Sequence, residues 1–185
     1  MSMYAGVFNI HARYWRAYGG VHALVRSFYL HAAVALSLIC SNLWLTTGWW
    51  DMGIAVIPKV LAYTVLGFAA FLGFAKSKFL QSLAEPEADP TRPSVYAALC
   101  ATFVHFIIVQ VTALLFAILA KALHFPWHAA PDTFRLVLPW FNGAAGFVGF
   151  TVFMYALTST LATVMHLFRI ALMYEQFEKH SRKAN

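Results

Sequence analysis

Four polar side chains lie inside apolar stretches of this sequence: Lys59, Asn42, His105 and Gln110. Ionisable groups in hydrocarbon are costly, and they commonly mark an ion path, a proton relay or a ligand contact. A ring of Lys59 ammonium groups around an oligomer axis would favour anions or gate a pore, with Asn42 as a hydrogen-bond partner. The alternative is that the long stem of Lys59 lets its ammonium group snorkel to the membrane surface.

His105 is expected inside the bilayer and Gln110 near its centre. Polar groups of this type usually form hydrogen bonds with neighbouring helices, which stabilise by about 0.6 kcal/mol on average. No acidic residue accompanies them within the apolar runs. Contacts between helices are therefore the first interpretation, and a proton path or a metal site is the alternative.

A possible metal group follows the third apolar run, where His124, His128 and Asp132 are spaced by four residues. On one helix this spacing would align them on one face, as zinc ligands often are. Pro126 and Pro131 interrupt such a helix. We therefore interpret these side chains as interfacial loop residues, and we expect neither a metal nor another cofactor. Since no catalytic motif is recognisable, we also expect the protein not to be an enzyme.

The composition defines the elements that must carry these residues. Of the 185 residues, 61% are hydrophobic and 11% are charged, whereas a soluble domain has roughly 25% charged residues. Four apolar runs occupy most of the chain, and spans of about 20 residues each leave little room for a soluble domain. The sequence therefore predicts an all-α, polytopic membrane protein with a single membrane domain over residues 1–185. Its basic residues are spread over short flanks and do not indicate nucleic-acid binding.

The expected transmembrane helices end at charged or turn-forming residues. Trp49 and Trp50 follow the first span, and paired tryptophans are typical of a membrane–water boundary. The four spans are expected at residues 27–47, 54–75, 95–120 and 141–168. A Pro-rich linker is expected at residues 76–94, and a charged tail at residues 169–185.

An amphipathic helix over residues 5–18 is expected at the headgroup level, with Trp15 in the interface and Arg13 and Arg16 reaching lipid phosphates. Ten of the 13 lysines and arginines lie in the amino-terminal flank, the linker and the tail, and two lie in the 121–140 loop. Because basic loops remain in the cytoplasm, both termini are expected on the cytoplasmic side of a bacterial inner membrane.

Small residues in the second and fourth runs indicate close helix packing: Gly143, Gly146, Gly149, Ala69 and Gly73. Small side chains let two helix backbones approach, either within one chain or between copies. A bundle of four short spans has little interior for a substrate cavity. A homo-oligomer with a site between its subunits is therefore expected.

The second run has the sequence Ile57-Pro58-Lys59-Val60-Leu61-Ala62-Tyr63-Thr64-Val65-Leu66-Gly67-Phe68. It resembles a Pro-x-x-Leu-Gly-Phe-x-Leu-Gly stretch in small four-span membrane proteins of bacterial phage-defence gene clusters. Its Pro…Leu-Gly-Phe segment is also similar to the second helix of bestrophin-type anion channels. Ala62 and Tyr63 stand where Gly and Phe are found in that pattern, and the Leu66-Gly67 pair is shifted by one. The resemblance implies a membrane sensor or effector that acts with a soluble partner.

The expected function is that of a non-enzymatic inner-membrane sensor or effector in bacterial stress or phage defence. It would either perturb the membrane as a pore or report an envelope disturbance to a cytoplasmic protein. The alternatives are an immunity or chaperone-like protein that binds a membrane toxin, and a small channel or carrier. The cytoplasmic contact surface would comprise Lys76, Lys78, Arg92, Arg169, Glu175, Glu178 and Lys179.

Overall fold

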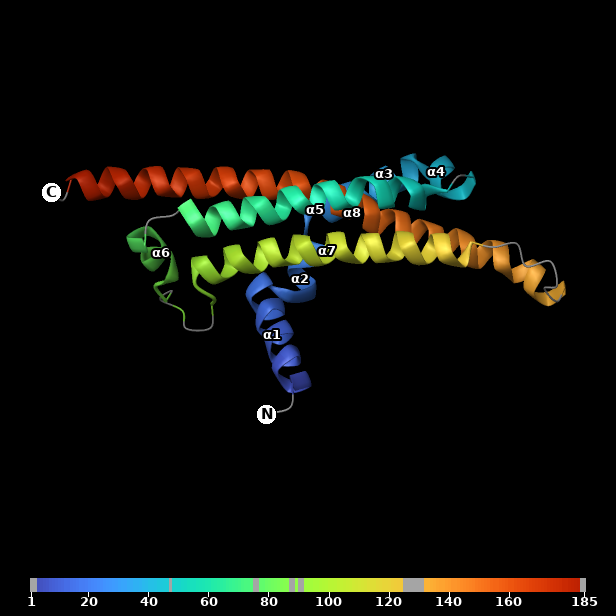
Figure 1. The fold of residues 1–185 in the computed structure, drawn as a ribbon, viewed down its shortest axis with the longest axis horizontal. Helices are drawn as coiled ribbons and strands as arrows, with labels where there is room; N and C mark the ends of the chain where they lie inside the picture. The colour runs from blue at the N-terminus through green and yellow to red at the C-terminus, as the bar shows by residue number, and fades with distance from the viewer. Residues whose placement is uncertain are drawn as a thin grey trace. The chain divides into compact units, whose positions relative to one another are not determined.

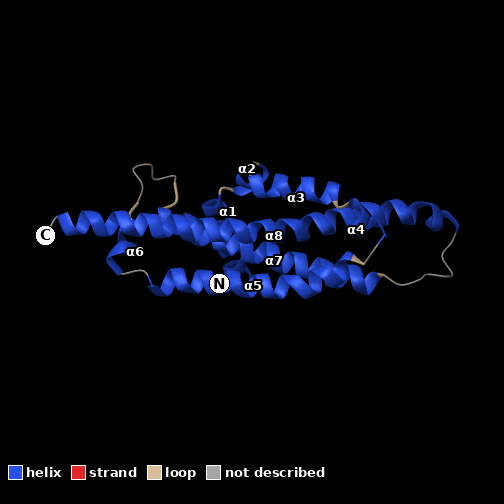
Figure 2. Ribbon diagram, turned by 90° about the horizontal axis from the view of Figure 1, so that it is seen from above, coloured by secondary structure: helices blue, strands red, loops and turns tan. Residues whose placement is uncertain are grey.

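A computed structural model describes residues 3–46, 48–74, 77–86, 89, 92–124 and 132–183 of the chain. Figure 2 shows helices and loops in this part of the chain, and no strand occurs in it. Lys76 and His128 lie outside the described residues. The described helices, labelled in Figure 1, are α1 (Met3–Tyr18), α2 (Gly20–Val25), α3 (Phe28–Ile39), α4 (Ser41–Thr46), α5 (Trp49–Phe74), α6 (Ser77–Ala84), α7 (Val95–Leu123) and α8 (Asp132–Lys183).

Three of the described helices are long and apolar enough to cross a membrane: α5, α7 and the part of α8 that begins at Val137. They contain 26, 29 and 52 residues over their full lengths, and a bilayer crossing requires about 20. The described part of the chain is therefore all-helical, and it is compatible with a multi-pass membrane protein.

The first apolar run, expected as one span at 27–47, is divided at Cys40 into α3 and α4. The 12 residues of α3 extend about 18 Å at about 1.5 Å per residue, which is less than the roughly 30 Å of a bilayer core. The indole Nε1 of Trp44 donates to the backbone carbonyl of Ser37 at 2.8 Å. This bond satisfies a carbonyl in the last turn of α3, where helical donors are missing.

Two long helices have bounds that differ from the expected spans. α5 begins at Trp49 rather than at residue 54, so that Asp51 lies in its first turn, where an acidic side chain favours the helix dipole. α8 begins at Asp132 and continues to Lys183, beyond the expected 141–168. In its last part, Lys179 pairs with Glu175 one turn away, and such pairs support a solvent-exposed helix.

The chain divides into two compact units, each of which is described by itself. Unit 1 comprises Met1–Ser27, Tyr63–Ile107 and Thr160–Asn185. Its core contains Phe71, Phe79, Leu83, Leu99, Phe103 and Ile170. Phe79 and Leu83 are one turn apart on α6, and both are buried, so this short helix covers part of the core.

Two glycines with positive φ separate the first two helices of unit 1. Gly19 has φ +100° and Gly20 has φ +65°, and both lie between α1 and the body of α2. Side chains with a Cβ rarely adopt this left-handed backbone conformation. The chain can therefore turn sharply directly after Tyr18.

Unit 2 comprises Phe28–Ala62 and Ile108–Ser159. Its core contains Trp49, Ile57, Ala113, Ala117, Phe150, Phe153 and Ala156. Two glycines allow the helices of this core to approach. A Cβ added at Gly53 would lie 3.0 Å from the Cβ of Ala117, and one added at Gly149 would lie 2.6 Å from the ring of Trp49.

Within unit 2, α3 and α4 pack along a limited stretch of α8. The Thr158 hydroxyl donates to the carbonyl of Tyr29 at 3.0 Å, and the rings of Trp44 and Phe147 have centroids 5.6 Å apart. The helix between Phe147 and Thr158 rises by about 17 Å at about 1.5 Å per residue. The contacts of α3 and α4 thus cover little more than half of a bilayer core.

Candidate functional site: a tryptophan-lined pocket

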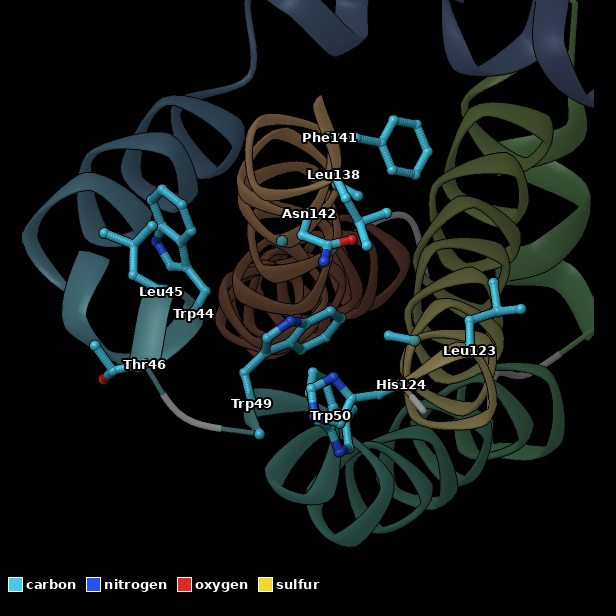
Figure 3. Close-up of a pocket in the computed structure, with 14 residues that line it drawn as sticks. Trp44, Leu45, Thr46, Trp49, Trp50, Leu123, His124, Leu138, Phe141 and Asn142 are labelled. Atoms are coloured by element: carbon cyan, nitrogen blue, oxygen red, sulfur yellow. The ribbon is translucent and has the colours of Figure 1, made fainter. Parts of the chain in front are cut away.

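A cavity of unit 2 lies where four helices meet: the end of α4, the start of α5, the end of α7 and the early part of α8. Its volume is about 500 Å³, and we name it the tryptophan pocket. Figure 3 shows the side chains around it. The lining residues are Trp44, Leu45, Thr46, Gly48, Trp49, Trp50, Ala120, Leu123, His124, Leu138, Phe141, Asn142, Ala145 and Gly146.

Two tryptophans of the pocket pack closely against glycines of α8. Trp49 is only 3% exposed, and its ring lies so close to Gly149 that any Cβ there would displace it. A Cβ added at Gly146 would lie 3.2 Å from the carbonyl oxygen of Trp44. These glycines therefore act as contact sites for tryptophan side chains and backbone, and the aromatic wall is fixed by core packing.

The polar groups of the pocket are few and carry no formal charge when histidine is neutral. They include the side chains of Asn142, Thr46 and His124, together with indole N–H groups. The His124 ring lies 4.6 Å from the ring of Trp50, measured between centroids. In Figure 3 the amide of Asn142 points toward the indole of Trp49. The pocket thus combines apolar walls with hydrogen-bonding groups, as small-molecule sites commonly do.

An ion pair closes the same end of unit 2 without lining the pocket. The ammonium group of Lys121, in the last turn of α7, lies 2.8 Å from the carboxylate of Asp51 in the first turn of α5. Both side chains are more than half exposed, at 58% and 63%, so the pair contributes at most about 1 kcal/mol. Asp51 is therefore engaged with Lys121 and not with Lys59.

Lys59 is the eleventh residue of α5, because the helix begins at Trp49. At about 1.5 Å per residue it lies about 15 Å from the start of the helix. Its side chain is exposed, and it forms no ion pair or hydrogen bond with any described residue. Asn42, its expected partner, instead accepts hydrogen bonds from the hydroxyl of Thr46. The hydroxyl oxygen lies 2.6 Å from the backbone carbonyl oxygen of Asn42 and 3.1 Å from its side-chain Oδ1.

His105 belongs to unit 1, where aromatic side chains of α1 cover it. It is 3% exposed, and its Nδ1 lies 2.8 Å from the hydroxyl of Tyr14. The ring of Tyr18 stacks on it with a centroid distance of 3.8 Å and an angle of 16° between planes. Gln110 belongs to unit 2 and is fully buried. The two residues therefore belong to different units, and each is enclosed by protein.

The other expected residues occupy several environments. Gly143 and Gly73 have no atom within 4 Å of an added Cβ, and Ala69 is exposed. Gly67, which was not among the predicted packing residues, would place a Cβ 3.2 Å from Leu167.

The interfacial candidates on α1 also differ. Arg13 and Arg16 are exposed, and Arg16 bonds to the carbonyl of Ala12. Trp15 instead stacks near Tyr18, with a centroid distance of 6.0 Å.

Two further expectations concern metals and the cytoplasmic surface. Among the described residues, no three His, Cys, Asp or Glu side chains converge as a metal site. The described charges of the expected contact surface include local pairs, Arg92 with Asp89 and Lys179 with Glu175. Lys78 and Arg169 are exposed.

Sequence reasoning did not find the tryptophan pocket, although one signal was present. Trp44, Trp49 and Trp50 lie within seven residues of sequence, and Asn142 opens a glycine-rich stretch of an apolar run. The contact of Tyr14 and Tyr18 with His105 left no such signal, because the residues are about ninety positions apart.

Comparison with known proteins adds no family. The chain matches no protein-family model, no curated protein and no solved structure. The class of protein is therefore defined by the fold alone: the described residues are all-helical and contain three candidate transmembrane helices.

Proposed function

We propose that the protein is a non-enzymatic membrane effector that acts as a homo-oligomer, with Lys59 facing a water-filled path between copies. The observation that carries the proposal is the exposure of Lys59 about 15 Å along a helix long enough to cross a membrane. Charged groups at such positions almost always face a bundle interior or a water-filled cavity.

The cost of the alternative supports the same conclusion. A lysine at the centre of a transmembrane helix costs about 2.5–3.5 kcal/mol on insertion scales. Snorkelling lowers this cost near a helix end, but Lys59 has fifteen residues after it and ten before it in α5. A second copy of the chain that covers Lys59 with water or polar groups removes this cost.

The neighbours of Lys59 suit close contact between copies. Met52 lies seven residues before Lys59, Ala55 lies four residues before it, and Ala62 lies three residues after it. All three side chains are exposed. Residues at these spacings share one face of a helix. Two of the three have side chains of one carbon, and small residues let helices in a membrane approach.

The cellular role rests on the resemblance of residues 57–68 to small membrane proteins of phage-defence clusters. The protein acts in bacterial stress or phage defence at the inner membrane, with a cytoplasmic protein as its partner. The exposed charges at Lys78, Arg169 and the end of α8 support a polar contact surface on the side where basic residues are concentrated.

The proposed topology has four crossings and both termini in the cytoplasm. In addition to the three long candidate spans, residues 28–46, in α3 and α4, form a short crossing, which is the first along the chain. A short hydrophobic segment is accommodated when the bilayer thins or flanking residues snorkel, and Arg26 directly precedes α3. Cysteines introduced at Val25 and Thr46 should react with impermeant reagents from opposite sides; labelling from one side would contradict this topology.

Ion flux tests the pore. The purified protein in liposomes should pass anions in preference to cations, and Lys59→Glu should reverse that preference because the charge at the narrow part of the path changes sign. Lys78→Glu is the matched control, since it makes the same change at an exposed position of α6 outside the candidate spans. Ion-tight liposomes, or equal effects of the two variants, would contradict the pore. A clean monomer in nanodiscs would contradict the oligomer and favour a toxin-binding immunity protein.

A further inference from the structure

We propose that the tryptophan pocket binds one membrane glycerolipid. An acyl chain lies against the aromatic wall, and the glycerol ester region lies beside Asn142 and His124. The inference requires that the chain resides in a membrane. It does not require a pore, an oligomer or a partner protein.

The rim of the pocket favours a ligand that arrives through the bilayer. Leu45, Leu123 and Phe141 line the pocket and are nevertheless 60%, 71% and 67% exposed. Such large apolar side chains are tolerated outside a fold where hydrocarbon is the solvent. The apolar rim therefore continues the lipid-facing surface into the pocket, and an acyl chain meets no polar barrier on the way in.

The polar groups define which part of the lipid they contact. Asn142, His124 and the Trp49 indole offer N–H donors, and no aspartate, glutamate, lysine or arginine lines the pocket. Phosphate groups are typically bound by arginine or lysine, and Lys121 at this end is engaged with Asp51. Neutral acceptors match the lining better, and the ester carbonyls of a glycerolipid are such acceptors.

The depth of the pocket agrees with this assignment. It lies at the first turn of α5 and the last turn of α7, which are the ends of two candidate spans. Tryptophan side chains concentrate at the membrane–water interface, the level at which the glycerol esters of a bilayer lie. Its volume of about 500 Å³ is within the roughly 300–1,000 Å³ of small-molecule sites, enough for an ester group and part of one chain.

Tryptophan fluorescence provides a direct test in the full chain. Trp15, Trp127 and Trp140 are replaced by Phe, which leaves the three pocket tryptophans as reporters. The protein is placed in nanodiscs that contain increasing fractions of phosphatidylcholine with bromine atoms on one acyl chain. Occupation of the pocket should quench the fluorescence along a saturating curve at low mole fraction, whereas random contact with bulk lipid gives a gradual decrease.

A matched pair of variants assigns the quenching to the pocket. Ala145→Leu fills space in the lining and should raise the lipid fraction at half-quenching about tenfold, equivalent to about 1.4 kcal/mol. Ala144→Leu makes the same change at an exposed neighbour outside the lining and should leave the curve unchanged. Saturable quenching that both variants leave intact, or quenching that never saturates, would overturn the site.

A second variant tests the ester contact and does not depend on the folding of the first. Asn142→Leu should weaken binding of the ester-linked lipid about fivefold, as expected for one lost hydrogen bond. It should not change binding of a brominated ether-linked lipid, which lacks the ester carbonyls. Equal effects on both lipids would overturn the assignment of Asn142. Displacement by a short-chain benzoquinone at lower mole fraction than any glycerolipid would overturn the choice of ligand.

The outcomes separate this site from the proposed pore. Ion-tight liposomes with saturable quenching would remove the pore and retain the lipid site. Ion flux that Lys59→Glu alters, together with quenching that never saturates, would retain the pore and remove the lipid site.

Discussion

His105 and Lys59 are both polar residues of long apolar helices, but they differ in burial and in their hydrogen-bond partners. In unit 1, His105 is 3% exposed, with its Nδ1 against the hydroxyl of Tyr14 and its ring beneath Tyr18. In unit 2, Lys59 is exposed and bonds to none of the described residues. The chain therefore satisfies one of these groups itself and leaves the other to its surroundings.

The difference separates a structural role from a functional one. A buried polar group with its partners in place stabilises a particular packing arrangement, and its removal leaves an unsatisfied neighbour. A charged group that the fold leaves uncovered needs water, lipid headgroups or another chain. His105 thus explains how α1 attaches to α7, whereas Lys59 points to something outside the chain.

The largest expected effect concerns membrane insertion, and it tests whether the exposed Lys59 lies inside the bilayer. Lys59→Leu should make insertion of α5 about 3 kcal/mol more favourable, because lysine is strongly disfavoured and leucine favoured at the centre of a span. Translation of the full chain into membranes, with glycosylation sites that report insertion of α5, measures this. Lys121→Leu at the end of α7 is the control and should change insertion little. Equal effects would mean that Lys59 lies near the surface.

A smaller effect is expected from the glycine contacts within unit 2. Gly149→Ala should destabilise the protein by about 2 kcal/mol, within the range for overpacked cores, because the new Cβ would lie 2.6 Å from the Trp49 ring. Gly143→Ala has no atom within 4 Å and should stabilise by about 0.5 kcal/mol through helix propensity. Unfolding by sodium dodecyl sulfate in mixed micelles reports both. Two changes of the same sign would show that α8 does not pack on Trp49 as described.

The smallest expected effect tests the contact that covers His105. Tyr14→Phe removes the hydroxyl that bonds to His105 and should cost about 1 kcal/mol, with faster tryptic cleavage at Arg13 and Arg16 as α1 detaches. Tyr63→Phe is the control, since Tyr63 is 70% exposed in the same unit. If the two variants unfold and are cleaved alike, the contact between Tyr14 and His105 does not hold α1.

Much of the helical architecture could be predicted from local sequence. Long runs such as 95–120 have no interruption by charge or proline, and the corresponding helix α7 is a candidate span. The division of the first run at Cys40 could not be predicted, because neither Gly nor Pro marks it. There the side chain of Trp44 satisfies the carbonyl of Ser37, a contact that depends on how α3 and α4 are oriented.

The candidate site shows a similar limit. Trp49 and Trp50 indicated a membrane boundary, but the sequence did not show that Trp49 is a core residue and that Trp50 lies against His124. The observed start of α5 also places Lys59 deeper in its helix than the sequence predicted. A helix that begins at residue 49 rather than 54 places this lysine about 7.5 Å farther from the start of the helix, at about 1.5 Å per residue.

By itself, the sequence determined that the chain is helical and has long apolar runs, because apolarity adds up along a run of neighbouring residues. It predicted four spans, whereas three of the described helices are long and apolar enough to cross a membrane. Only the tertiary structure decided that Tyr14 covers His105, that Lys59 stays uncovered and that three tryptophans surround a pocket. These contacts depend on the rotation and register of one helix against another. Small residues such as Gly146 and Gly149 set that register through close approach, and their partners lie far away in sequence.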